Sequence, residues 1–233
     1  MWSYTLWFLK NYRAVWWFIF LSSALPSVIM GRQFYTQQLG PNPLQYLQHA
    51  TGRWALIFLL LSLTITPLRQ ILSAFCIYLH VRFGKRLEDW NWIIRLRRML
   101  GLYCFYYASL HMLVYVLFDL ALQWRWAVSD IQEKPYIILG VTAFVMLVPL
   151  AITSHSKLFQ LMGVRAWKRL HKIVYLILLI VIMHFWWQTK TGVYDYLPYA
   201  IVACLLLGFR LLNWWGVFRR CSGSDGMAVT PRV

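Results

Sequence analysis

The chain contains six apolar stretches. Coiled into a helix, each would be about as long as the hydrocarbon core of a bilayer is thick. They lie near residues 14–30, 54–68, 100–120, 136–153, 170–188 and 194–212. A helix needs roughly 20 apolar residues to cross that core, and a helix also satisfies its own backbone hydrogen bonds there. The chain is 61% hydrophobic and 13% charged, with a mean hydropathy of +0.55, far from a soluble composition. The sequence therefore predicts an all-α integral membrane protein built as a six-transmembrane-helix bundle.

The positive charge of the chain lies mainly in alternate loops. With six spans, only five of the 23 Lys and Arg residues fall on the side opposite to the termini: Arg32, Arg53, Arg125, Lys134 and Lys190. Because Lys and Arg concentrate in cytoplasmic loops, both termini are expected in the cytoplasm. The net charge of +16 then reflects topology and attraction to anionic membrane lipid, so we expect no nucleic-acid partner.

The regions outside the spans divide the chain into three parts. Residues 1–216 are expected to form one transmembrane domain, and residues 217–233 are expected to form a disordered cytoplasmic tail. Residues 69–98 are expected to form a basic cytoplasmic loop. Its apolar stretch, residues 71–81, is too short to span and is predicted to be an interfacial or re-entrant helix.

Two histidines, His111 and His184, lie inside apolar spans, where an ionisable side chain is unfavourable without a partner. At ~1.5 Å per residue, His111 lies ~17 Å and His184 ~21 Å from the same membrane edge. These depths agree within about one helical turn, so both imidazoles could ligate one haem iron. Either histidine taken alone could instead be hydrogen-bonded to a neighbouring helix. The cysteines show no C-x-x-C-H spacing, so covalent haem attachment is not indicated.

The other histidines and an arginine cluster are secondary candidates. His171 lies near the cytoplasmic face, ~20 Å below His184, and shares a face with it only if the helix is locally distorted. The third span has Arg97 and Arg98 where a second haem would need a histidine, although His155 could substitute as a ligand. These arginines suit haem propionates, a flavin phosphate or lipid phosphate. His49 is expected to have an interfacial role or to lie near the edge of the haem.

Six short motifs occur in order along the chain: residues 48–53 (QHATGR), 64–68 (TITPL), 97–102 (RRMLGL), 109–111 (SLH), 134–136 (KPY) and 167–175 (WKRLHKIVY). Together they resemble the haem-binding membrane subunit of the bacterial periplasmic methionine sulfoxide reductase system. That group belongs to the ferric-reductase-like transmembrane superfamily, which also contains NADPH oxidases. The resemblance runs from about Gln48 to the end of the sixth span. Two departures are a longer 69–98 loop and the presence of His155.

The resemblance implies a b-type haem protein of the bacterial inner membrane. It would take electrons from membrane quinol or a cytoplasmic flavin reductase, and pass them to a separate periplasmic molybdopterin-containing catalytic subunit that reduces methionine sulfoxide. The family's histidines fall on His111, His171 and His184. FMN has been associated with the family, but no motif here places it.

The residues leave two alternative functions to consider. A stand-alone ferric or quinone reductase would need a nucleotide-binding domain, and no Gly-rich fingerprint follows the sixth span. A cofactor-free transporter or assembly factor would need polar residues along a path at the midplane. Apart from the histidines and Asp119, the spans offer few such residues.

Overall fold

The computed structural model describes residues 3–80, 84, 86–120, 122–123, 130–188 and 193–215, and every regular element in these residues is a helix. The long helices are α1 (Ser3–Tyr35), α2 (Pro43–Tyr78), α3 (Asn91–Val114), α5 (Tyr136–Ile152), α7 (Val174–Gln188) and α8 (Val193–Trp214). Shorter pieces are the 3₁₀ turn Leu87–Trp90, the π-helical turn Tyr115–Asp119, α6 (Ser156–Leu170) and the 3₁₀ turn His171–Ile173.

The lengths and compositions of the helices fit a membrane protein with several spans. Five helical segments are long and apolar enough to cross a membrane: Tyr12–Tyr35, Pro43–Tyr78, Asn91–Asp119, Ser156–Gln188 and Tyr194–Trp214. Tyr136–Ile152 is a shorter apolar helix. The expectation of an all-helical, multi-pass membrane protein is therefore confirmed.

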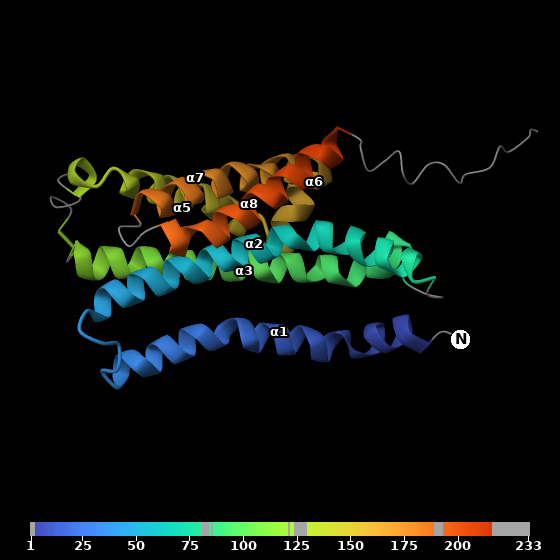
Figure 1. The fold of residues 1–233 in the computed structure, drawn as a ribbon, viewed down its shortest axis with the longest axis horizontal. Helices are drawn as coiled ribbons and strands as arrows, with labels where there is room; N and C mark the ends of the chain where they lie inside the picture. Colours follow the sequence, from blue (N-terminus) through green and yellow to red (C-terminus); the bar gives the residue numbers. More distant parts are fainter. Residues whose placement is uncertain are drawn as a thin grey trace, which may run out of the picture.

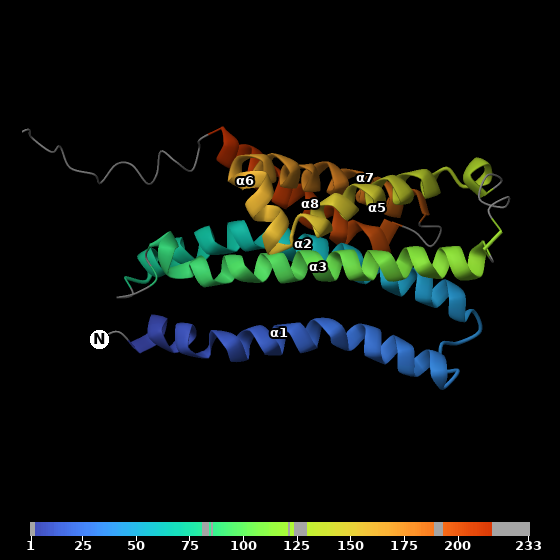
Figure 2. The ribbon, with the colours of Figure 1, turned by 180° about the vertical axis from the view of Figure 1, so that it is seen from behind.

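The long helices lie side by side along the longest axis of the molecule (Figures 1 and 2). One end of this bundle has the connection between α1 and α2, and we call it the α1–α2 end. The other end has the connection between α2 and α3, together with the start of α1 and the α6 segment (Figure 1). We call it the α2–α3 end.

The connection between the second and third spans is shorter than expected for a 69–98 loop. Residues 69–78 continue α2, and residues 91–98 form the first turns of α3. The sequence after Leu68 has no helix-breaking residue before His80, so the helix continues instead of ending at the membrane edge. The basic residues Arg82 and Lys85 and the predicted tail at 217–233 lie outside the described residues.

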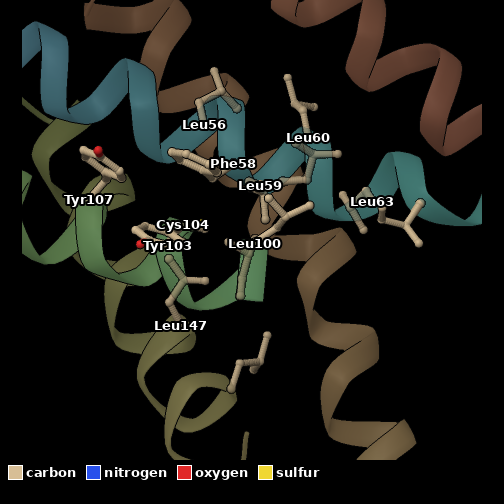
Figure 3. Packing of buried hydrophobic residues seen from close by; sticks show 14 of the residues in the cluster. Leu56, Phe58, Leu59, Leu60, Leu63, Leu100, Tyr103, Cys104, Tyr107 and Leu147 are labelled. Carbon is tan, nitrogen blue, oxygen red and sulfur yellow. The ribbon is translucent and has the colours of Figure 1, made fainter. Parts of the chain in front are cut away.

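The core of the bundle lies between α2 and α3 and is rich in aromatic rings. Phe58 of α2 stacks on Tyr107 of α3, with ring centroids 5.3 Å apart and planes at 9°. It also stacks on Tyr103, at 5.5 Å. Figure 3 shows these rings beside the buried leucines of α2. Such large, rigid side chains fix the spacing of α2 and α3, on which the site described below depends.

Helix α1 is joined to this core through the Tyr107 side chain, which is completely buried. The Tyr107 hydroxyl donates to the backbone carbonyl of Ser23 at 2.8 Å and accepts the backbone N–H of Ser27 at 3.1 Å. These two backbone groups are four residues apart, so the hydroxyl inserts into the i→i−4 pattern of α1. Pro26 lies between them and removes one further helical donor. Tyr103 adds a bond of 2.8 Å to the carbonyl of Phe20.

Candidate functional site

His111 of α3 and His184 of α7 meet inside the bundle. Their ring centroids are 6.2 Å apart and their planes stand at 85°. Both line a cavity of about 120 Å³ near the α1–α2 end, which we call the histidine cavity. Its other walls are mostly apolar and come from α2, α3, α5 and α7, including Leu56, Ala108 and Phe144. The structure therefore brings together the two residues whose depths in the membrane were expected to match.

The His111 ring is held against the backbone of α2. Its Nδ1 lies 2.9 Å from the carbonyl oxygen of Gln48, and the Thr51 hydroxyl is 3.4 Å from the same nitrogen. Gly52 makes this approach feasible, because a Cβ at that position would lie 3.0 Å from Cε1 of His111.

His184 is held against α5 in the same way. Its Nδ1 lies 2.8 Å from the carbonyl oxygen of Tyr136. A Cβ on Gly140 would lie 2.8 Å from Cε1 of His184, closer than real Cβ atoms approach. Each imidazole is therefore bonded to the carbonyl of one helical residue and covers the glycine four residues later, Gly52 after Gln48 and Gly140 after Tyr136.

These contacts fix the chemical form of both imidazoles. A carbonyl oxygen only accepts, so each Nδ1 must donate its hydrogen, and the neutral ring then has a free lone pair on Nε2. A histidine that ligates a metal is usually oriented in this way, by a carbonyl or carboxylate on its other nitrogen. The two rings are thus prepared as Nε2 ligands.

The spacing of the rings fits two ligands on one metal ion. Metal–imidazole bonds of roughly 2 Å put each ring centroid about 3 Å from the metal, so two imidazoles that bind one ion can have centroids up to about 6 Å apart. Among the described residues no group of three or more His, Cys, Asp or Glu side chains is placed to hold a metal ion. A metal between His111 and His184 would therefore have to bring its remaining ligands with it, as an iron porphyrin does.

The edge of the histidine cavity is polar. His49, Arg53 and Gln188 line it along with Tyr115, which begins the π-helical turn after His111. The side-chain Oε1 of Gln48 is buried there without a hydrogen-bond partner. Single π-helical turns are frequent at functional sites. His49 thus lines the histidine cavity, and its place near the edge of a haem stays a prediction.

A second cavity, of about 510 Å³, lies toward the α2–α3 end, and we call it the basic cavity. His171 lines it. The ring of Trp167 packs against the His171 ring with centroids 4.0 Å apart and planes at 35°, and the Thr153 hydroxyl lies 3.4 Å from Nε2 of His171. Its cationic lining residues are Arg97, Arg98, Lys168, Lys172 and Arg210. His171 begins the 3₁₀ turn His171–Ile173, so the helix is locally distorted between it and α7.

His155 does not line the basic cavity. It lies exposed at the start of α6, where its Nδ1 accepts the backbone N–H of Lys157 at 3.4 Å. Among the described residues, His171 is the one histidine that lines the basic cavity.

A single layer of side chains separates the two cavities. Leu59 of α2, Cys104 of α3 and Leu147 of α5 line both of them, and all three are buried. Figure 3 shows these three side chains among the other buried hydrophobic residues. The histidine cavity and the basic cavity are therefore adjacent compartments, stacked along the bundle axis and divided by apolar atoms.

Sequence reasoning did not find the residues that position the imidazoles. Gly52 and Gly140 are the sequence signal for this arrangement. A glycine inside an apolar helix often marks a place where a side chain or another helix approaches the backbone closely. The carbonyls of Gln48 and Tyr136 give no signal, since every residue has one. The contact between the Trp167 and His171 rings is consistent with their four-residue spacing, which places them on one helical face.

The sequence matches known proteins along most of its length. The family described as ferric reductase like transmembrane component matches residues 51–182. A protein-methionine-sulfoxide reductase heme-binding subunit from Ralstonia nicotianae is 38% identical over 210 residues, covering 89% of this chain and 87% of that protein. The corresponding subunit from Herminiimonas arsenicoxydans is 35% identical over 212 residues, covering 91% and 89%. That from Xanthomonas campestris is 40% identical over 192 residues, covering 80% of each. This chain therefore belongs to the ferric-reductase-like transmembrane family, in the group of protein-methionine-sulfoxide reductase heme-binding subunits.

Proposed function

We propose that this protein is the electron-transfer membrane subunit of a methionine sulfoxide reductase system, with one haem b held between His111 and His184. The observation that carries the proposal is the pair of imidazoles, 6.2 Å apart, each bonded through Nδ1 to a backbone carbonyl. The names of the relatives, which are heme-binding subunits, agree with this use of the pair.

The protein's own contribution is to orient the ligands and exclude water. The carbonyls of Gln48 and Tyr136 hold both rings in one tautomer, and apolar side chains such as Leu56 and Phe144 form the walls. A haem in this cavity would supply one-electron redox chemistry. Its potential would be set by two neutral imidazoles in a medium of low dielectric constant. Catalysis on methionine sulfoxide would then belong to a partner chain.

The direction of transfer follows from the proposed topology. The α2–α3 end, with its arginines and lysines, would face the cytoplasm, and the α1–α2 end would face the periplasm across the inner membrane. Electrons would arrive from quinol or a cytoplasmic flavin reductase and leave from the histidine cavity to a periplasmic molybdopterin-containing subunit. All six apolar helices would span the membrane, including the shorter α5.

The basic cavity is suited to the anionic part of a second cofactor. Its arginines and lysines would pair with haem propionates or with the phosphate of FMN. His171 could supply one ligand to a metal in the basic cavity, and no second histidine among the described residues lines that cavity. A second haem would therefore need a ligand from outside this set, whereas FMN would need none.

The two alternative functions, a stand-alone reductase and a cofactor-free transporter, make different demands on this structure. A stand-alone ferric or quinone reductase would also hold haem, and it would reduce its acceptor without a partner chain. A cofactor-free transporter would leave His111 and His184 bonded to their carbonyls and would require a polar path. The apolar layer of Leu59, Cys104 and Leu147 between the cavities speaks against such a path.

The experiment that tests the site is the reduced-minus-oxidised visible spectrum of the purified protein, with pyridine haemochrome quantitation. Wild type should show a low-spin b-type signal of at least one haem per chain, and His111→Ala or His184→Ala should abolish it. His155→Ala is the matched control, because His155 is exposed and lines neither cavity. A full low-spin signal in either cavity variant would overturn the assignment.

His171→Ala distinguishes the second cavity from the first. We expect the low-spin signal of the histidine cavity to persist, while the rate of reduction by quinol or flavin reductase, or the content of a second cofactor, decreases. Loss of all haem in this variant would contradict the pairing of His111 with His184. Release of flavin on denaturing wild type, and not the variant, would place FMN in the basic cavity.

A further inference from the structure

A third cavity lies between α1 and α3, separate from the histidine site. It has a volume of about 640 Å³. Trp16, Phe20 and Ala24 line it from α1, and Met99, Leu102 and Tyr106 line it from α3. We call it the α1–α3 groove. Leu102 and Tyr106 are 40% and 43% exposed, so one wall of the groove faces the surroundings of the bundle.

The groove exists because α1 is fixed to α3 at two separate levels. At one level the hydroxyls of Tyr103 and Tyr107 bond to the backbone of α1 between Phe20 and Ser27. At the other level the guanidinium of Arg95 lies over the ring of Tyr12, 5.4 Å from its centroid. Phe20 lies eight residues after Tyr12, which corresponds to about 12 Å of helix.

Two cations stand at one end of this apolar groove. Arg95 and Arg98 both line it, and a spacing of three residues puts them on the same side of α3. Among the side chains that the structure describes, no carboxylate forms an ion pair with either guanidinium. A cationic end on an apolar groove that opens outward fits a ligand with an anionic head and an apolar tail.

We propose that the α1–α3 groove binds one anionic phospholipid. Its phosphate would lie at Arg95 and Arg98, and one acyl chain would pass between Trp16 and Phe20 on α1 and Leu102 and Tyr106 on α3. Basic pockets between transmembrane helices on the cytoplasmic side bind anionic headgroups, and guanidinium groups bind phosphate with two parallel hydrogen bonds. Arg98 and Leu102 also line the basic cavity, so the groove shares these two residues with it. Neither residue lines the histidine cavity, and the proposal does not depend on a haem there.

The charge of the groove decides between lipid classes. A zwitterionic lipid brings a choline group that two guanidiniums repel, and a neutral lipid leaves both cations without a counter-ion. Near a membrane surface each Lys or Arg favours an anionic lipid by about 1 kcal/mol, which corresponds to about fivefold in binding.

Native mass spectrometry of the full chain, released from nanodiscs of equal parts phosphatidylglycerol and phosphatidylcholine, tests the proposal. Wild type should retain one phosphatidylglycerol per chain in preference to phosphatidylcholine. Arg95→Gln should reduce this retention about fivefold. Arg165→Gln is the matched control, an exposed cation of α6 that lines none of the cavities, and should leave retention unchanged.

A second variant separates the groove from general surface charge. Ala24→Phe puts a ring into the groove and should displace the acyl chain while leaving both arginines in place. Far-UV circular dichroism of each sample reports folding without reference to any cofactor, and neither Arg95 nor Ala24 lines the histidine cavity. If either variant loses its fold, Tyr106→Ala and Leu102→Phe alter the opposite wall. Equal retention of both lipids by wild type, or equal loss in Arg95→Gln and Arg165→Gln, would overturn the proposal.

Discussion

Gly52 and Gly140 leave the space that the two imidazoles occupy. Gly52 and Gly140 bring no chemistry of their own, and their contribution is the missing Cβ that lets an imidazole rest on a helix backbone. The bonded carbonyl lies four residues earlier in each case. The site is thus built twice from the same local arrangement, on α2 and on α5.

Gly140→Ala should weaken haem binding, because the new Cβ would lie 2.8 Å from Cε1 of His184 and would displace the ring. Overpacking of this kind costs about 1–3 kcal/mol, which corresponds to a loss of haem affinity of about fivefold to about 150-fold. Haem content after purification and a low-spin spectrum measured during titration with haem would detect it.

Gly208→Ala is the matched control for that experiment. It is also a glycine inside a transmembrane helix, and its Cβ would have no atom within 4 Å. The substitution should leave haem binding unchanged and should slightly stabilise α8, by roughly 0.5–1 kcal/mol. Equal haem loss in both glycine variants would show that the contact with His184 is not the cause.

At the level of whole elements, α1 depends on Tyr107 more than on apolar packing. Most of its surface faces outward, as the exposed side chains of Trp17, Phe18 and Leu21 illustrate. In a membrane such side chains gain little by leaving lipid for protein, so hydrogen bonds and close packing decide where α1 docks. The hydroxyls of Tyr103 and Tyr107 provide those bonds.

Tyr107→Phe should loosen α1, since it removes the hydroxyl that bridges the carbonyl of Ser23 and the N–H of Ser27. We expect a decrease in the free energy of unfolding of about 1–2 kcal/mol, measured in detergent. Tyr103→Phe removes one bond, to Phe20, and should cost less. A larger effect at Tyr103 than at Tyr107 would refute this account.

The ion pair before α5 is exposed and should contribute less stability than the buried hydroxyl bonds of α1. The hydrogen bond from Lys134 to Asp130, 3.0 Å long, raises the pKa of Lys134. A raised pKa in the folded state gives stability that is complete at neutral pH and is lost only when strongly alkaline pH removes the proton. Because the Lys134 side chain is 46% exposed, Asp130→Asn should lower the free energy of unfolding at pH 7 by less than about 1 kcal/mol. The difference between this variant and wild type should disappear at strongly alkaline pH, in denaturant titrations at the two pH values.

The sequence predicted the elements better than it predicted their ends. The apolar stretches located every long helix, because each stretch is close to the thickness of a bilayer. Their ends were underestimated, since α2 and α3 continue as helix beyond the apolar residues and no breaker stops them. The proximity of His111 and His184 followed from counting residues along two helices that run the same way. The carbonyls that orient them could not be predicted, because they depend on which helices are neighbours.

At the scale of the whole molecule, the two cavities and the charged end define a direction across the bundle. The basic cavity and its arginines lie toward the α2–α3 end, and the histidine cavity lies toward the α1–α2 end. The proposed function requires that these ends face the cytoplasm and the periplasm, respectively.

Cysteine labelling in intact cells tests that orientation. Gln37→Cys lies in the exposed connection between α1 and α2, and His80→Cys lies in the exposed residues after α2. A membrane-impermeant maleimide should label Gln37→Cys directly in spheroplasts and should reach His80→Cys only after the membrane is opened. The unmodified chain gives the background from its own cysteines. The reverse pattern would invert the proposed topology.

The layer formed by Leu59, Cys104 and Leu147 affects electrons and protons differently. Apolar side chains one layer thick are a small obstacle to an electron but offer no hydrogen-bonded chain for a proton to follow. An electron passing from the basic cavity to the histidine cavity would therefore move charge without compensation, and the step would be electrogenic. Charge movement across a membrane potential is worth about 2.3 kcal/mol per 100 mV, so outward electron transfer would be favoured by the inside-negative potential of a respiring cell.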